Sequence, residues 1–302
     1  RRITMKKSMK KLFLSLIVVV TGFILVACGG GNEGNGSSDE GAKDKLAEIK
    51  EAGELLVGTS PDFPPMEFYI LDENGERKIV GSDIFLAEAI AEEIGVELNI
   101  RATDFNGVMA NVQSGSVDLG LAGFTFTEKR AEAMQFSTGY LQESDIGFQG
   151  IMVQKDLAEQ FSTLDEFKEA GLRLGAQSGS IQYEMATSLT DAANVKQYGT
   201  LDVGLAALNQ GDIDAMIVST SSAEPMLATF SNLTILPQES FDLDPERLYS
   251  TNAAVLPLSD EYASLLELVN DVITKNIENG NIAKWHAEAI ELSANAIEVE
   301  EE

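Results

Sequence analysis

The segment NGVMANVQSGSVDLGLA, residues 106–122, predicts a helix that ends at Gly115 and leads into an apolar strand. The segment VGLAALNQGDIDAMIV, residues 203–218, repeats the same order of helix, glycine, aspartate and apolar strand. A glycine suits the left-handed conformation that commonly ends a helix, and a continuous apolar run suits a strand covered on both faces. Two copies of this unit in one chain predict two similar α/β lobes.

The segments around the two units continue the alternation of strands and helices. Residues 54–59 and 97–102 have the pattern of short strands, and residues 82–94 between them have the pattern of an amphipathic helix. Residues 262–278 and 282–292 are helix-like and follow near the C-terminus. Alternation of this kind indicates an α/β fold.

The N-terminal residues resemble a bacterial lipoprotein signal sequence. A basic stretch precedes an uncharged run over residues 12–27, which is short for a spanning helix of about twenty residues. The tetrapeptide Leu25-Val26-Ala27-Cys28 resembles the lipobox, in which the cysteine receives diacylglycerol. We therefore expect a signal peptide over residues 1–27 and a lipid anchor, palmitate included, at Cys28 on the extracytoplasmic face of the cell membrane. The alternative is a permanent N-terminal membrane helix.

The composition argues against a nucleic-acid partner and against an internal disulfide. The chain has 302 residues with 21 Lys and Arg against 49 Asp and Glu, a formal net charge of −28. Such a charge repels phosphate backbones, so we expect no nucleic-acid partner. The only cysteine is Cys28, which leaves no internal disulfide.

Residues 28–43 are rich in Gly and Ser and predict a flexible tether, and residues 293–302 predict a frayed acidic tail.

Several separated segments, taken in order, resemble family 3 of the bacterial extracellular solute-binding proteins, the polar amino-acid receptors of ABC importers. The resemblance covers nearly all of the chain from residue 44 to residue 292. Its segments are GTSPDFPPMEF at 58–68, GSDI at 81–84, SGSVD at 114–118, AGFTFTEKR at 122–130, LGAQSGS at 174–180, GDIDA at 211–215 and GNIAKW at 280–285.

The resemblance implies a type II periplasmic-binding-protein fold, in which two α/β lobes are joined by two hinge crossings. Lobe 1 would comprise residues 44–142 and 250–292, and lobe 2 residues 143–249. The crossings would lie near residues 140–148 and 246–252. The implied protein is a monomer that closes on a small amino acid and delivers it to an ABC permease. We expect no cofactor and no metal.

Two other functions on the same fold are an amino-acid sensor and a dehydratase-type enzyme. A sensor would need a further membrane span and an output module, and the sequence predicts neither. An enzyme would need a catalytic set, but the only histidine, His286, has no cysteine or histidine near it in the sequence. We therefore expect a binding protein and not an enzyme.

Arg130 is the strongest candidate for ligand binding. If Thr127 caps a helix, Arg130 lies in the first turn, where a cation is disfavoured by the helix dipole, and such a violation suggests a function. A guanidinium can hold a carboxylate by two parallel hydrogen bonds. The resemblance implies that Arg130 clamps the ligand's α-carboxylate, with Thr125 as a hydroxyl partner and Ala122 and Gly123 supplying backbone groups.

The second lobe is expected to complete this site. The resemblance implies contacts from Gln177, Ser180 and Ile181, although Ser180 would also serve as an ordinary helix cap. Where these receptors usually place an acid for the ligand's α-ammonium, this chain has Ser219. Either Glu224 reaches back, or hydroxyls and water suffice, or the ligand is not an ordinary α-amino acid.

The first lobe is expected to recognise the ligand's side chain. Phe63 and Phe105 match positions that sandwich the ligand in the family, and Ser60, Asp62 and Glu67 lie close in sequence. Acids and aromatic faces suit a cation. We therefore expect a polar or basic amino acid, with glutamine, arginine or lysine before any aliphatic one. One alternative is that the acids point outward and leave a mainly apolar pocket. Another is that Glu67 is a structural residue, because this acid belongs to the family's common pattern.

Overall fold

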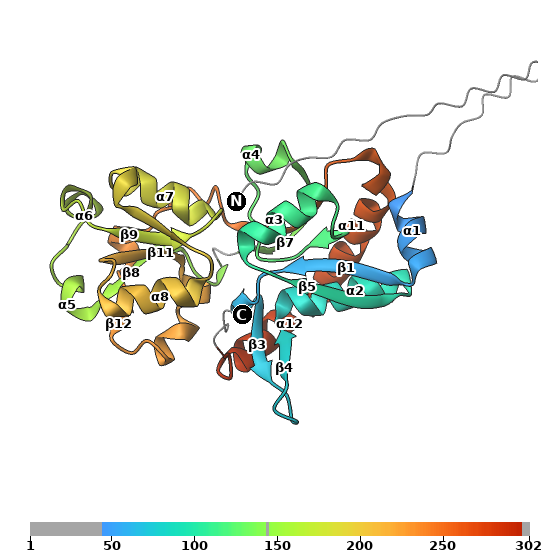
Figure 1. The fold of residues 1–302 in the computed structure, drawn as a ribbon, viewed down its shortest axis with the longest axis horizontal. Coiled ribbons are helices and arrows are strands. Elements are labelled where there is room, and N and C mark those ends of the chain that lie inside the picture. The colour runs from blue at the N-terminus through green and yellow to red at the C-terminus, as the bar shows by residue number, and fades with distance from the viewer. Residues whose placement is uncertain (1–43, 143–144, 298–302) are drawn as a thin grey trace, which may run out of the picture. The chain divides into compact units, whose positions relative to one another are not determined.

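The structure, a computed structural model, describes residues 44–142 and 145–297, and these residues form two large mixed sheets and one small sheet (Figure 1). The first large sheet has the strand order β5-β1-β6-β13-β7. Its strands are β5 (Glu97–Ala102), β1 (Glu54–Thr59), β6 (Leu119–Gly120), β13 (Thr251–Pro257) and β7 (Met134–Gln142). We call this sheet with its helices lobe 1.

The second large sheet has the strand order β10-β9-β11-β8-β12. Its strands are β10 (Val195–Tyr198), β9 (Leu174–Gln177), β11 (Ala215–Ser219), β8 (Gln149–Gln154) and β12 (Leu233–Ile235). We call this sheet with its helices lobe 2. In each large sheet one inner strand, β13 or β8, pairs antiparallel with both of its neighbours. Each of these two strands is the first that the chain forms after it passes from the other sheet, which confirms the type II α/β fold.

The repeated unit lies at corresponding places in the two lobes. Helices α3 (Phe105–Ser114) and α8 (Leu201–Gln210) end at Gly115 and Gly211, whose φ angles of 70° and 82° are left-handed as predicted. The strand that follows is shorter than predicted in lobe 1, where only the two residues of β6 form a ladder.

The aspartate of each unit has the same structural task. Asp118 accepts a hydrogen bond from Leu56 N at 2.9 Å and pairs with Lys45, also at 2.9 Å. Asp214 accepts from Arg173 N at 2.8 Å and pairs with the guanidinium of the same arginine at 2.6 Å. Each carboxylate thus binds the backbone of a neighbouring strand, which explains why both units carry an aspartate there.

Lobe 1 buries its sheet between helices on both faces. Ile90, Leu265 and Ile282 are among the side chains by which one group of helices packs on β1 and β13, and α3 covers the other face with Val108 and Val112. Burying a side chain of this kind stabilises a fold by about 1.5–3 kcal/mol. The first group of helices comprises α1 (Lys45–Ala52), α2 (Ser82–Ile94), α11 (Ala263–Glu278) and α12 (Asn281–Ser293). The short helix η4 (Asp260–Tyr262) directly precedes α11.

Lobe 2 is built in the same way. Phe167 and Met185 pack on one face of its sheet, and Leu205 and Leu208 of α8 pack on the other. Its remaining helices are α5 (Lys155–Ala158), α6 (Leu164–Glu169), α7 (Ile181–Leu189), η2 (Ala192–Asn194), α9 (Thr220–Ala223), η3 (Pro225–Ala228) and α10 (Gln238–Phe241). The strands predicted as apolar runs are therefore covered on both faces.

The small sheet belongs to the site described below. It consists of β2 (Asp62–Phe63), β3 (Glu67–Leu71) and β4 (Arg77–Val80), all antiparallel. At the end of the described chain, Ile297 N donates to Tyr69 O of β3 at 2.9 Å. Ile297 of the predicted tail thus lies against β3, which the acidic composition did not suggest.

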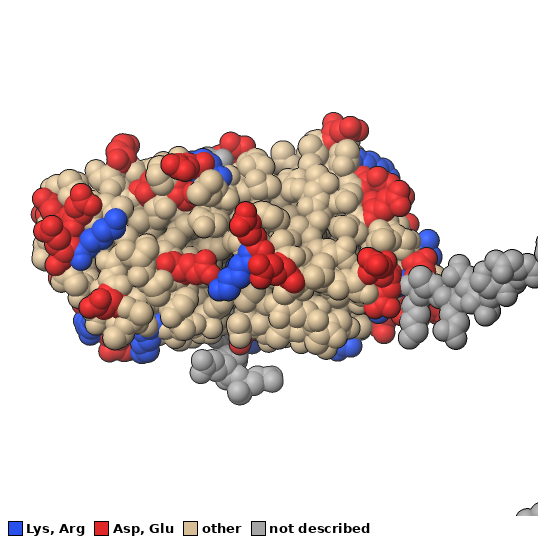
Figure 2. Space-filling view, turned by 90° about the horizontal axis from the view of Figure 1, so that it is seen from above, with Lys and Arg blue, Asp and Glu red and all other residues tan. Residues whose placement is uncertain are grey.

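The predictions for the N-terminus concern residues that the structure does not describe. The expected signal peptide, the tether and Cys28 lie outside the described residues. Within the described residues, no helix has the length and apolar character needed to cross a membrane. Figure 2 shows acidic side chains spread over one face of the molecule with basic ones among them, so the net charge is not gathered into one patch on that face.

Candidate ligand-binding site

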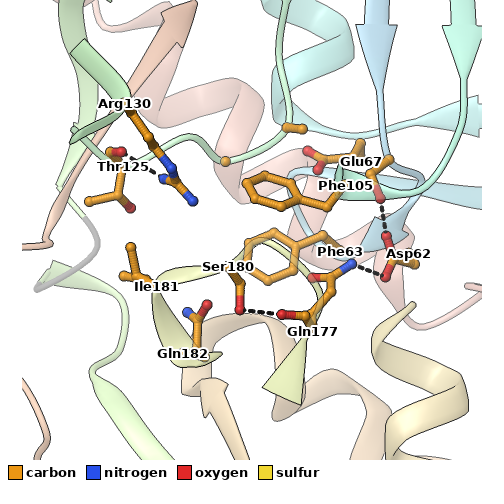
Figure 3. A pocket seen from close by; sticks show the side chains of 13 residues that line it. Asp62, Phe63, Glu67, Phe105, Thr125, Arg130, Gln177, Ser180, Ile181 and Gln182 are labelled. Carbon is orange, nitrogen blue, oxygen red and sulfur yellow. Dashed lines mark hydrogen bonds between the residues drawn. The ribbon is translucent and has the colours of Figure 1, made fainter. Parts of the chain in front are cut away.

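A pocket lies between the two lobes and is lined by side chains from both (Figure 3). Its empty volume is about 400 Å³, counted with its opening to solvent. Every predicted ligand contact except Ser219 lines it, together with Gln182, which was not predicted. The lining residues are Ser60, Asp62, Phe63, Glu67, Phe105, Ala122, Gly123, Thr125, Arg130, Gln177, Ser180, Ile181 and Gln182.

Arg130 reaches one end of the pocket from the short helix α4 (Glu128–Ala131). The Thr127 hydroxyl accepts from Arg130 N at 3.1 Å, which confirms the predicted cap. The guanidinium donates to Thr125 O at 2.8 Å and to Gly179 O of lobe 2 at 3.2 Å. It also lies over the Phe105 ring, 5.3 Å from the centroid. These contacts hold the guanidinium in place but do not neutralise it.

The charge of Arg130 has no acidic counterpart. Among the residues that the structure describes, no carboxylate lies within 4.0 Å of this guanidinium. Glu184 is the acid whose charge acts on it, but Glu184 pairs with the exposed Lys129 at 3.1 Å. Burial lowers the pKa of Arg130 to about 10, so the group stays charged at neutral pH. A cation held in this way attracts an anion such as a carboxylate.

Asp62 lines the pocket, but its oxygens are engaged elsewhere. Oδ1 accepts from the Ser60 hydroxyl at 2.5 Å, and Oδ2 accepts from Gln177 Nε2 at 2.8 Å and from Leu201 N at 2.6 Å. Gln177 and Leu201 belong to lobe 2, and Leu201 is the first residue of α8. Burial raises the pKa of Asp62 to about 7, although the hydrogen bonds from Ser60 and Leu201 oppose that shift. Asp62 therefore joins the lobes, and its contact to the ligand's side chain stays a prediction.

Glu67 lies at the opposite end of the pocket from Arg130 (Figure 3). Its side chain is fully buried, and neither carboxylate oxygen has a hydrogen-bond donor among the described residues. Burial raises the pKa of Glu67 well above its ordinary value, and the charges of Asp83 and Asp62 raise it further. The pattern around Glu67 did not reveal that this acid would have no donor.

Asp83 is a functional candidate that the sequence did not reveal. It lies in the first turn of α2, where an acid is ordinarily favoured by the helix dipole, so its position gave no signal. Its Oδ2 accepts from Tyr140 Oη at 2.7 Å and from Gly123 N at 3.0 Å. Burial raises its pKa to about 6, and these two bonds and one with Glu67 oppose that shift.

Phe63 and Phe105 occupy the middle of the pocket, with Arg130 on one side and Glu67 on the other (Figure 3). Gly123 approaches Phe63 so closely that a Cβ atom there would lie 3.0 Å from the ring. The φ of Gly123, 56°, is also one that residues with a side chain rarely adopt. The glycine thus lets the backbone of the Ala122–Gly123 segment reach the aromatic pair.

Lobe 2 lines the pocket through the start of α7. Ser180 caps this helix by accepting from Tyr183 N at 3.2 Å, so its expected role as an ordinary cap is present as well. Gln182 follows in the first turn, and its Nε2 donates to Gln149 Oε1 at 2.8 Å. The amide oxygen of Gln182 is the atom left for a ligand. A polar side chain directly after the predicted contacts was the signal that could have identified it.

Ser219 does not line the pocket. It ends β11, is buried, and shares a hydrogen bond of 2.8 Å with the Ser221 hydroxyl. Glu224, the alternative acceptor for the ligand's ammonium, is exposed and is not a lining residue either. Among the described residues, Gln182 is one of the lobe 2 residues that line the pocket with an amide oxygen for which no donor is seen.

Comparisons with known proteins agree with this geometry. The model of bacterial extracellular solute-binding proteins, family 3, matches residues 55–290. The arginine-binding extracellular protein ArtP of Bacillus subtilis is 28% identical over 278 residues, 91% of this chain and 96% of that protein. The L-cystine-binding protein TcyJ of Escherichia coli is 26% identical over 268 residues, 87% of this chain and 93% of that protein.

Solved structures give the same result. The crystal structure of an amino acid ABC transporter substrate-binding protein from Streptococcus pneumoniae, bound to L-arginine, is similar with a TM-score of 0.73 and 28% sequence identity. The similarity covers 85% of this chain and all of that one. This chain, with its two lobes and the pocket between them, thus resembles a solved amino-acid-binding protein along most of its length.

Proposed function

Because the chain belongs to family 3 of the bacterial extracellular solute-binding proteins, we propose that it captures a basic amino acid, arginine or lysine, for an ABC importer. One observation carries the choice of ligand. Among the described residues, each end of the pocket has a buried group without its counterpart: the Arg130 guanidinium has no carboxylate within 4.0 Å, and the Glu67 carboxyl has no donor. A basic amino acid carries a carboxylate at one end and a cation at the other.

The ligand would lie with its α-carboxylate on Arg130. Two parallel hydrogen bonds from the guanidinium would hold it, and the Thr125 hydroxyl lines the pocket close by. The α-ammonium would donate to the amide oxygen of Gln182. This places a neutral acceptor where many such receptors use an acid, and a charge-assisted bond to a neutral acceptor is weaker than an ion pair.

The ligand's side chain would pass Phe63 and Phe105 and end at Glu67. Aromatic faces attract guanidinium and ammonium groups, by about 0.5–2 kcal/mol per contact. An aliphatic side chain would leave Glu67 without a partner, at a cost of about 1–3 kcal/mol for each unsatisfied buried group. Arginine-binding relatives and an arginine-bound neighbour support the same choice.

The proposal extends to location and partners. Cys28 would carry the lipid anchor on the extracytoplasmic face of the cell membrane, and residues 28–43 would tether the two lobes to it. The lobes would open and close about the two crossings between the large sheets, and the closed form would dock on an ABC permease. The protein would bind its ligand without changing it, like the binding proteins among its relatives.

A thermal-shift screen of the common amino acids and cystine tests the proposal. A ligand at 1,000 times its dissociation constant stabilises the folded protein by about 4.1 kcal/mol. For a protein of this size each kcal/mol raises the melting temperature by about 2–4 °C, so arginine or lysine should raise it by roughly 8–16 °C. A large shift with glutamine, leucine, methionine or cystine, and none with arginine or lysine, would contradict the proposed ligand.

A further inference from the structure

Glu67 and Asp83 form a pair of buried carboxyl groups at the inner end of the pocket. Both side chains are fully buried, and a hydrogen bond of 3.0 Å from Asp83 N to Met66 O brings the start of α2 beside the residue that precedes Glu67. The two carboxyl groups interact electrostatically. Within residues 44–142 and 145–297, the donors that reach the pair are Tyr140 Oη and Gly123 N, and both go to Asp83 Oδ2. Glu67 Oε1, Glu67 Oε2 and Asp83 Oδ1 have no donor among the described residues.

Two ionised carboxylates are acceptors only, so this arrangement needs a proton between them. Two interacting carboxyl groups in a buried site cannot both stay ionised, so one of them remains protonated. The donors on Asp83 Oδ2 favour the ionised form of Asp83. The proton therefore resides on Glu67, whose carboxyl then donates to Asp83.

The other charged and titratable groups around the pair do not supply that proton. From β2, Asp62 acts on Glu67 with a further negative charge, and its oxygens are already engaged with lobe 2. From β7, Tyr140 donates its hydroxyl to Asp83. From α4, Arg130 lines the far end of the pocket. The cation nearest to Glu67 in a complex would thus be the ligand's own side chain.

We propose that the Glu67–Asp83 pair couples the binding of a cationic ligand to the release of one proton. The step rests on the proposed function. The guanidinium or ammonium of the ligand takes the place of the proton on Glu67, so the Glu67 O–H bond breaks, the proton passes to solvent, and an ion pair forms. A ligand with a neutral side chain leaves the proton in place between Glu67 and Asp83.

This coupling makes the affinity for cationic ligands depend on pH. In the pH range where Glu67 is protonated in the free protein and ionised in the complex, each increase of one pH unit should strengthen arginine binding by up to about tenfold. The affinity for L-citrulline, which has the length of arginine with a neutral urea group, should stay level over the same range. The pair would therefore separate basic from neutral ligands most strongly at alkaline pH.

Calorimetry in buffers of different ionisation enthalpy measures the released proton directly. The purified protein is titrated with L-arginine and with L-citrulline at pH 7.5 in phosphate and in Tris. We expect about one proton released per arginine and about none per citrulline. Arginine binding without net proton release, or equal release with both ligands, would overturn the inference while leaving the ligand assignment intact.

Variants localise the proton. Glu67→Gln should abolish proton release on arginine binding, whereas Glu93→Gln, at an exposed ion pair with Lys275 on the surface of lobe 1, should keep it. Release that persists in Glu67→Gln would overturn the assignment to this pair.

Infrared spectroscopy of the ligand-free protein at pH 7.5 gives a readout that needs no ligand. The wild type should show the band of a buried protonated carboxyl that Glu67→Gln lacks, and identical spectra would equally overturn the assignment. If neither ligand binds, the proposed function fails, and the infrared band alone decides whether the pair holds a proton.

Discussion

Replacing Arg130 with alanine removes the group that we expect to hold the ligand's carboxylate. The guanidinium is fixed by Thr125 O and Gly179 O and has no acid of its own among the described residues, so its charge is available to a ligand. Truncating one member of a buried charge pair costs about 2–5 kcal/mol of binding. Since about 1.4 kcal/mol corresponds to a factor of ten, Arg130→Ala should weaken binding by about 30-fold to several thousand-fold.

Arg130→Lys separates charge from geometry. It keeps a cation in the pocket but cannot form two parallel hydrogen bonds, and it loses at least one of the carbonyl contacts. We expect an affinity between those of the wild type and Arg130→Ala.

The matched control is the neighbouring Lys129 of the same short helix. Its side chain is 83% exposed and pairs with Glu184 on the surface, so Lys129→Ala should change the affinity by no more than about threefold. Isothermal calorimetry gives the affinities, and thermal unfolding checks that each variant is folded. An Arg130→Ala protein that is folded and binds within threefold of the wild type would refute the reasoning.

Three further predictions concern other parts of the molecule. Burial raises the pKa of Glu67 in the folded protein, so the ligand-free folded state retains a proton that the unfolded state loses, and stability falls as pH rises above the ordinary glutamate pKa. The melting temperature of Glu67→Gln, relative to wild type, should therefore increase from pH 5 to pH 8, and parallel pH curves would contradict this. Gly179→Ala places a Cβ 2.4 Å from the terminal methyl of Met109 in lobe 1, which must shift for the lobes to close, so ligand binding should weaken by about threefold, which corresponds to roughly 0.7 kcal/mol. Gly171→Ala is its control, because Gly171 is also left-handed but has no atom within 4 Å of the new Cβ; equal losses of affinity in the two variants would exclude an effect on lobe closure. Cys28→Ala should abolish labelling of the protein with palmitate, and undiminished labelling would rule out Cys28 as the anchor.

Local sequence rules predicted those parts of the fold that depend on neighbouring residues. Gly115 and Gly211 end their helices because the left-handed conformation is a property of the residue itself, and Thr127 caps α4 through a hydroxyl three residues from its partner. The resemblance to a family predicted most of the residues that line the pocket, since the family's motifs lie at the ends of strands that meet between the lobes.

The parts that sequence did not predict depend on distant partners. Asp62 was expected to face a ligand, but its oxygen accepts from Leu201, 139 residues away, a pairing that no local pattern encodes. Asp83 resembled an ordinary acid at a helix start, and its link to Glu67 arises only when α2 packs beside β3. Ser219 lies at the end of its strand as expected, but it shares a hydrogen bond with the Ser221 hydroxyl and does not line the pocket.

A crystal structure of the protein with L-arginine tests the central claim most directly. The account predicts one arginine between the lobes, with its α-carboxylate within hydrogen-bonding distance of the Arg130 guanidinium and its side chain passing Phe63 and Phe105 to reach Glu67. An arginine bound in the reverse orientation, or bound outside this pocket, would contradict it.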